Sequence, residues 1–240
     1  MSAPGTGAGD KVLTEYLCGT ILSGHYILPP GQTVDCGRNT DGREGYALKI
    51  PSGSSLEIPL MSTYSGGPIT VNGGSLVVFG TVDFREPYNP NEDGPGNPWY
   101  GSINVYSGTL QTYSGSRIMG KGFLVRAWGD GVLLLDGGQF SCTSCFSVIS
   151  CSRYDSDDTC TIHFGSDTSV SATSTIKSGN PIIGIQGKVT RRAGVTVSIS
   201  PALDGHSTNY YTYYDGPIGK FDDAYKRHAP IPESASPSGF

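Results

Sequence analysis

Short runs in which apolar and polar residues alternate recur along the chain. In the stretch "ITVNGGSLVVFGTVDF" the alternation stops at a glycine pair, resumes, and stops again at Gly80 before returning. Alternation with a period of two predicts strands that bury one face, and glycine allows sharp bends between them. The stretch therefore predicts three very short strands. The side chains expected to point inward are Ile69, Val71, Leu76, Val78, Val82 and Phe84.

The same pattern repeats before and after this stretch. "LKIPSGSSLEI", "ITVNGGSLVVF" and "INVYSGTLQTY" each place two alternating apolar residues before a turn with glycine, and a leucine after it. The equivalent leucines, Leu56, Leu76 and Leu110, are separated by 20 and 34 residues. The longer interval contains the Pro/Asn/Gly-rich segment Arg85–Tyr100, which we expect to be a loop of about 14 extra residues. A degenerate fourth copy places Val132 at the leucine position, 22 residues after Leu110.

A period near 20 residues with three short strands per period is typical of a solenoid, whose repeats bury their inner residues only by stacking. Over residues 46–200 the pattern resembles the right-handed parallel β-helix, or β-solenoid. The resemblance implies an all-β fold with about 20–22 residues per coil. Residues 1–45 would then form an N-terminal arm and cap, and residues 201–240 an aromatic segment and an extended C-terminal tail. The alternative is a β-sandwich or jelly roll, in which strands recur every 8 to 12 residues.

Composition and charge narrow the class of protein. With Gly 35 and Pro 16 among 240 residues, a helical bundle is disfavoured. The net charge is −5 and no basic cluster exceeds two residues, so we expect no nucleic-acid partner. No apolar run is long enough for a membrane span. The first residues lack a basic segment followed by an apolar one, which predicts synthesis in a cytoplasm without a secretory signal.

The six cysteines admit several interpretations. In a cytoplasm they would be reduced thiols, unless the product reaches the exterior by lysis or assembly. Four of them gather within 19 residues and could hold zinc, form disulfides, or be buried thiols. We expect a structural role and no cofactor, because the paired spacing typical of structural zinc sites occurs only once. The alternative zinc set is Cys142, Cys145, Cys151 and Cys160.

An acidic stretch is the alternative candidate for catalysis. "SRYDSDDTC" contains Asp155, Asp157 and Asp158. The resemblance to β-helix proteins implies a carbohydrate-cleaving role for such carboxylates, which would protonate a glycosidic oxygen or bind calcium. Aspartate and serine also favour an ordinary solvated turn. The four histidines are dispersed and no nucleophile or phosphate motif is present, so we expect no catalytic site.

Aromatic residues are the most distinctive candidates for binding a partner. "NYYTYYDG" places rings on both faces of an extended segment, a composition suited to a protein interface, to sugar stacking or to capping the solenoid. The expected partner-binding residues are Tyr210, Tyr211, Tyr213, Tyr214, Phe221, Tyr225 and Phe240. Large residues at outward positions, such as Val77, Phe79, Tyr106 and Tyr113, suggest a lateral partner as well.

These features together favour a structural protein rather than an enzyme. In organisation the chain resembles the β-helical spike, fibre and capsid-decoration proteins of bacteriophages. The resemblance implies a homotrimer on the virion surface after cytoplasmic synthesis in the host. Its termini would anchor it to other particle proteins of the capsid or tail, and it could contact a cell-surface polysaccharide. The alternatives are a polysaccharide-binding or polysaccharide-cleaving β-helix enzyme and a bacterial surface adhesin.

Overall fold

The computed structural model describes residues 10–36, 47–84, 103–152, 159–173, 183–214 and 226–234, without the side chains of 121–123, 144–146 and 185. This part of the chain is nearly all β, with one short 3-10 helix, η1 (Glu15–Leu17). The strands are β1 (Lys11–Val12), β2 (His25–Ile27), β3 (Thr33–Asp35), β4 (Leu48–Pro51), β5 (Ser55–Ile58), β6 (Thr63–Ser65), β7 (Ile69–Val78), β8 (Thr81–Asp83), β9 (Ile103–Tyr113), β10 (Arg117–Ser152), β11 (Thr161–Ala172), β12 (Ile183–Ile185), β13 (Lys188–Arg191), β14 (Val197–Leu203), β15 (His206–Thr208), β16 (Tyr210–Tyr214) and β17 (Lys226–Pro230).

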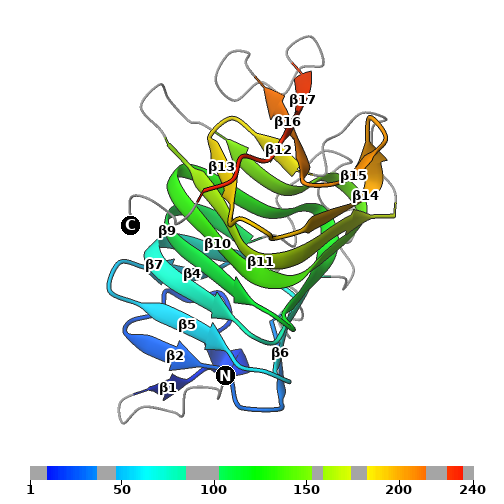
Figure 1. Ribbon diagram of the computed structural model, residues 1–240. Coiled ribbons are helices and arrows are strands. Elements are labelled where there is room, and N and C mark those ends of the chain that lie inside the picture. Colours follow the sequence, from blue (N-terminus) through cyan, green and yellow to red (C-terminus); the bar gives the residue numbers. More distant parts are fainter. Residues whose placement is uncertain are drawn as a thin grey trace, which may run out of the picture.

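All the strands belong to one 17-stranded sheet, and nearly all of its pairings are parallel. The sheet is curled into a half-barrel, with β1 and β2 at one end and β16 and β17 at the other (Figure 1). Parallel pairing excludes the β-sandwich and jelly-roll alternatives, which are built from antiparallel strands. Within the described segments, no helix is long and apolar enough to cross a membrane.

The parallel pairings fall into three series around the curl. Series 1 runs through β1, β2, β5, β7, β9, β10, β11 and β13. Series 2 runs through β3, β6, β8, β10, β11 and β14. Series 3 runs through β4, β7, β9, β10, β12 and β16. The long strands take part in more than one series because they continue around the bends of the sheet.

The predicted leucine register is confirmed. Leu56 pairs with Leu76 and Leu76 with Leu110, and all three side chains are completely buried. The six residues expected to point inward from the stretch Ile69 to Phe84 are also buried. The number of strands differs, because the first two of the three predicted strands are joined as β7. The core therefore lies inside the curl, where aliphatic side chains of successive strands lie one above another.

The predicted fourth copy is displaced by one residue. Leu110 pairs with Leu133 instead of Val132. The reason is an irregularity between Ala127 and Asp130, where β10 has one extra residue relative to β9. A bulge of this kind moves every later side chain to the opposite face, and counting residues does not reveal it.

The sheet extends into both regions that the sequence assigns to the ends of the chain. The sheet begins at β1, well before residue 46, and β2 and β3 pair with β5 and β6. The sequence pattern does not reveal β2 ("HYI") and β3 ("TVD"), because three residues are too few to show alternation. At the other end, β17 pairs antiparallel with β16, and Ile231 is buried. Part of the predicted extended tail is therefore folded onto its own chain. Pro230 is tolerated in β17 because a proline lacks the N–H group that an inner strand would need, and β17 lies at a sheet edge. Beyond β17, the Pro232 carbonyl accepts a 2.9 Å hydrogen bond from the Arg191 N–H.

Candidate functional site

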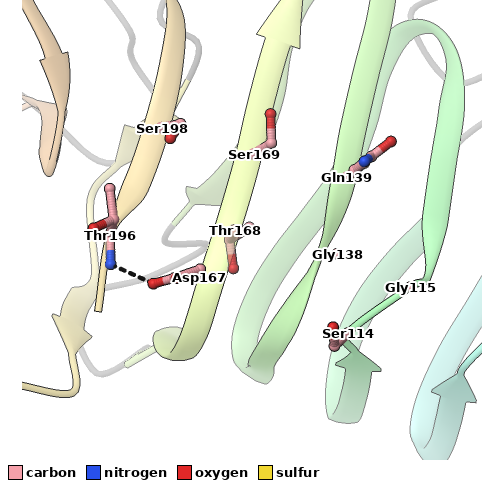
Figure 2. Close-up of a pocket in the computed structure, with 9 residues that line it drawn as sticks. All are labelled: Ser114, Gly115, Gly138, Gln139, Asp167, Thr168, Ser169, Thr196 and Ser198. Carbon is pink, nitrogen blue, oxygen red and sulfur yellow. Dashed lines mark hydrogen bonds between the residues drawn. The ribbon is translucent and has the colours of Figure 1, made fainter. Parts of the chain in front are cut away.

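A pocket of about 370 Å³ lies where the sheet bends between series 1 and series 2. Four parts of the chain contribute to it: the turn before β10, β10 itself, β11, and the start of β14 (Figure 2). The lining residues are Ser114, Gly115, Gly138, Gln139, Asp167, Thr168, Ser169, Thr196 and Ser198. With one exception, Asp167, these residues are uncharged.

Parallel register aligns part of this lining. Gln139 pairs with Ser169, and Ser169 pairs with Ser198. Their side chains extend from three neighbouring strands (Figure 2) and are exposed. Strands in a sheet lie about 4.8 Å apart, so these polar groups are repeated at that interval. Gly138 is required beside them, since a Cβ at this position would overlap Ser116 Oγ.

Asp167 connects two strands at the rim of the pocket. Its Oδ1 accepts a 2.8 Å hydrogen bond from the Thr196 N–H, and the Thr168 N–H donates to the Thr196 carbonyl at 3.0 Å. The Thr168 hydroxyl donates to the Ser166 carbonyl at 2.9 Å. These bonds fix the bend, and they leave the exposed Ser169 and Ser198 hydroxyls directed outward. Hydroxyl and amide groups both donate and accept hydrogen bonds, so the surface suits a neutral polar ligand.

A second cluster lies on the outer face of series 1. The rings of Phe79 and Tyr113 are stacked, with centroids 4.4 Å apart and planes 5° from parallel. Gln111 Nε2 donates to Asp136 Oδ2 at 3.2 Å. Burial is the main cause of a raised pKa of the Tyr113 phenol, and the Asp136 carboxylate adds to it. The outward aromatic residues predicted from the sequence therefore form a defined contact with each other.

The predicted tyrosine cluster is divided between the two faces of β16. Tyr214 is buried, Tyr210 and Tyr211 are partly buried against the core, and Tyr213 is 38% exposed. The Tyr210 ring also stacks on His206, with centroids 3.8 Å apart. Three of the four tyrosines therefore help to close this end of the sheet. The predicted contacts Phe221, Tyr225 and Phe240 lie outside the described residues.

Disulfides replace the reduced thiols expected from the sequence. Cys18 is bonded to Cys36 and Cys151 to Cys160, and Cys142 is also disulfide-bonded. Cys151 and Cys160 are completely buried, and a Cβ on Gly187 would overlap Cys151 Sγ. Oxidation removes Cys151 and Cys160 from the alternative zinc set as thiolate ligands. The described residues contain no other group of side chains that could hold a metal ion.

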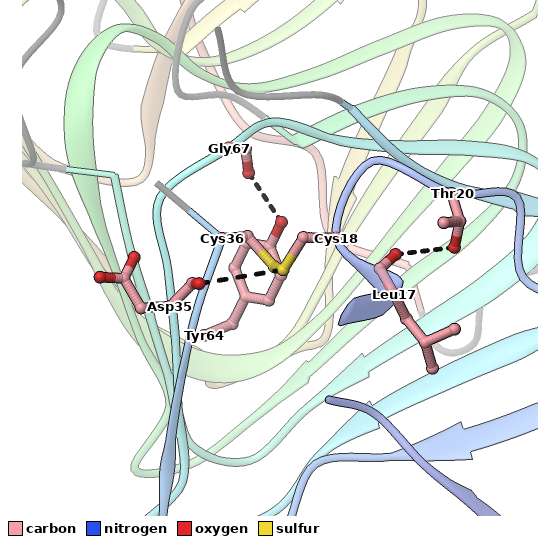
Figure 3. Close-up of a disulfide and its surroundings, with 7 residues drawn as sticks. All are labelled: Leu17, Cys18, Thr20, Asp35, Cys36, Tyr64 and Gly67. Carbon is pink, nitrogen blue, oxygen red and sulfur yellow. Dashed lines mark hydrogen bonds between the residues drawn. A yellow bond between two sulfur atoms is a disulfide. The ribbon is translucent and has the colours of Figure 1, made fainter. Parts of the chain in front are cut away.

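The Cys18–Cys36 disulfide joins the segment after η1 to the end of β3 (Figure 3). Cys18 Sγ lies 3.9 Å from the Asp35 carbonyl oxygen. In the same core cluster, the buried Tyr64 hydroxyl donates a 2.9 Å hydrogen bond to the Gly67 carbonyl. Burial, followed by the nearby Asp35 carboxylate, raises the pKa of Tyr64. The disulfide therefore ties the first strands of the sheet to its core.

Two further sequence predictions lie outside the described residues. These are the catalytic alternative Asp155, Asp157 and Asp158, and the loop Arg85–Tyr100. Conversely, sequence reasoning missed the pocket, because its aligned residues Gln139, Ser169 and Ser198 lie farther apart in the sequence than the predicted repeat of about 20 to 22 residues. The available signal was the abundance of serine and threonine at outward positions of the later strands.

Comparison with protein-family models, with curated proteins and with solved structures finds no match to this chain.

Proposed function

We propose that the protein is a non-enzymatic structural protein whose curled sheet forms a right-handed β-solenoid. In this proposal it is a spike, a fibre or a surface decoration of a bacteriophage-like particle. The observation that carries the proposal is the repeated parallel register, in which Leu56, Leu76 and Leu110 lie above one another. A stack of this kind is stiff along its length and presents side chains at regular intervals, which suits a protein that projects from a surface.

The disulfides support a location outside the cytoplasm. Structural disulfides persist in oxidising surroundings, such as a virion surface or the exterior of a cell. A host-made particle protein released by lysis would meet this condition, and so would a bacterial adhesin. We place the mature protein at the virion surface, in contact with other capsid or tail proteins and assembled as a homotrimer.

The pocket favours binding over cleavage as the second candidate function. Glycoside hydrolysis usually uses two carboxyl groups at a defined separation. Asp167 is the one carboxylate among the described lining residues, and it accepts a hydrogen bond from the Thr196 N–H. The hydroxyls of Ser169 and Ser198 can instead bind the hydroxyl groups of a cell-surface polysaccharide.

One part of the sequence-based hypothesis needs revision. Residues 226–234 pair with β16 and β13, so this part of the C-terminal tail serves the fold before it can serve as an anchor. We therefore assign attachment to the sides of the molecule and to segments beyond these residues.

Electron microscopy of particles from the native source, with an antibody to this chain, tests the proposal. We expect the antibody to label the particle surface, and absence of the chain from purified particles would contradict a virion role. Incubation with capsular polysaccharide tests the alternative separately. Release of reducing sugar ends would show cleavage, whereas retention of the polysaccharide without release would show binding.

A further inference from the structure

Three turns with the same hydrogen bond connect series 1 to series 2. In Pro29–Gln32, Pro59–Ser62 and Tyr113–Ser116 the last N–H donates to the first carbonyl, at 3.2, 3.1 and 3.0 Å. The third residue of each turn has a positive φ: 71° at Gly31, 67° at Met61 and 95° at Gly115. Turns of this type require glycine or asparagine at that position, because other side chains are strained there. Methionine at position 61 is therefore the exception.

The fold does not explain Met61. Its side chain is 81% exposed, so it contributes little to the core. A left-handed conformation is unfavourable for a residue with a Cβ, and an equivalent glycine is accepted in the Pro29–Gln32 and Tyr113–Ser116 turns. Strained non-glycine residues persist mainly where they have a role beyond folding. Met61 is thus exposed at a cost to stability.

Met61 belongs to a larger apolar surface. Leu60, next to it in the turn, is 56% exposed, and its Cδ1 reaches to 3.9 Å from where a Cβ on Gly115 would lie. Ile58, Val78 and Thr112 are aligned in series 1. The next residues along are Pro59, Phe79 and Tyr113, so the stacked rings of Phe79 and Tyr113 lie at the level of the residue that precedes Leu60. We call Leu60, Met61, Phe79 and Tyr113 the bend patch.

Acidic groups accompany the bend patch. Glu57 and Asp136 lie on the same outer face as Tyr113, and both carboxylates raise the pKa of its phenol in addition to the main effect of burial. The cation Arg117 follows the bend and lies in series 2, paired with Thr81. Aromatic faces and carboxylates both attract cations. In a symmetric pair of copies docked through this surface, these carboxylates would face each other, which disfavours a second copy as the occupant.

We propose that the bend patch is a docking surface for a partner protein that presents an apolar side chain next to lysine or arginine. Leu60 and Met61 would form the apolar centre of the contact, and methionine suits this role because its flexible thioether adapts to different surfaces. Glu57 and Asp136 would pair with the basic residues at the rim. This surface is additional to the polar pocket and does not depend on the particle assignment.

Methyl-labelled methionine provides a direct probe in the full chain. The protein has three methionines, of which Met119 is half-buried in β10 and serves as an internal control. Titration with a short peptide of Lys-Phe-Lys repeats should shift the Met61 methyl resonance and leave that of Met119 in place. Peptides of Glu-Phe-Glu or Lys-Ser-Lys repeats should bind at least about tenfold more weakly, because the first lacks the basic residues and the second lacks the apolar side chain. Equal binding of the three peptides would overturn the proposal.

Two variants separate docking from folding. Met61→Gly should keep or raise the thermal unfolding midpoint and should reduce the affinity for the Lys-Phe-Lys peptide by about tenfold or more. Asp136→Asn should reduce the affinity for this peptide mainly at low salt, where the attraction between charges is least screened. A lower unfolding midpoint for Met61→Gly would show that Met61 serves the fold and would overturn the argument. Sedimentation could instead show that the wild type self-associates and that Met61→Gly abolishes this association, which would also overturn the proposal. The same holds if polysaccharide, but not the basic peptide, shifts the Met61 methyl resonance.

Discussion

His163 shows how the environment of a single residue makes stability depend on pH. The side chain is on the outer side of β11 but is only 4% exposed, and its Nδ1 lies 2.9 Å from Thr190 Oγ1. Burial lowers the pKa of the imidazole, the Asp136 carboxylate partly opposes this effect, and the Arg192 cation adds to it. The folded protein therefore resists protonation of His163.

This lowered pKa predicts a loss of stability in mild acid. An unfolded histidine has a pKa of about 6.5, so below this pH the unfolded chain binds a proton that the folded chain excludes. The free energy of unfolding should fall as the pH drops through about 6.5 and level off below the folded pKa. Urea denaturation across this range measures the effect. His163→Gln should flatten the curve, and an unchanged slope would show that other groups cause it.

Leu76 offers a test of the core at the same scale. It is completely buried between Leu56 and Leu110, so Leu76→Ala should leave a cavity and reduce the free energy of unfolding by roughly 2 to 5 kcal/mol. Val77→Ala, at the neighbouring half-exposed position, is the matched control and should change it by less than about 1 kcal/mol. Chemical denaturation of both variants gives the comparison, and similar losses would contradict the register.

At the scale of elements, alternation and glycine positions were sufficient to predict the strands within the three similar copies between Leu48 and Tyr113. Ile69 and Val71 show why: each alternates with a polar residue and repeats in the next copy. The first and last strands could not be found in this way. β2 and β3 have three residues each, and β17 contains a proline, so their places depend on pairing with strands far away in the sequence.

The C-terminal strand makes a clear prediction about this end of the sheet. A chain ending at Tyr214 would lose β17, the buried Ile231 and the Glu233 carboxylate, which lies 2.7 Å from the Arg191 guanidinium. The exposed edge of β16 would then be free to pair with another molecule. We expect lower stability and self-association in sedimentation experiments. A chain ending at Ser234 is the control, and if both truncations behave alike, the segment does not close the sheet.

At the scale of the whole molecule, the disulfides crosslink segments that lie at or just beyond the ends of their elements. The Cys18–Cys36 bond closes a separation of 18 residues near one end of the sheet. Replacing both cysteines with serine should reduce the free energy of unfolding by about 2 to 4 kcal/mol, mainly by freeing the unfolded chain. Denaturation with and without a reducing agent measures this. Because the double variant lacks this bond, the reducing agent should destabilise it less than it destabilises the wild type. Equal stability of variant and wild type without reducing agent would contradict a stabilising role for the bond.

The candidate surfaces were harder to foresee than the core. Phe79 and Tyr113 could be identified as outward aromatic residues, but their stacking depends on the alignment of β7 with β9. The special position of Met61 appears only when its turn is compared with those of Gly31 and Gly115. Oxidation of Cys151 and Cys160 depends on two segments meeting in space, and spacing in the sequence left three interpretations open.

The unequal intervals between aligned leucines have an evolutionary consequence. Leu76 and Leu110 pair as closely as Leu56 and Leu76, although 34 residues separate the first pair and 20 the second. Natural selection can therefore lengthen or replace the connection between two strands without altering the pairing on either side. Addition of one further strand to a parallel series would lengthen that series by about 4.8 Å, the spacing between strands. Lineages of such a protein should differ in steps of this size, while the inward aliphatic positions keep their pattern.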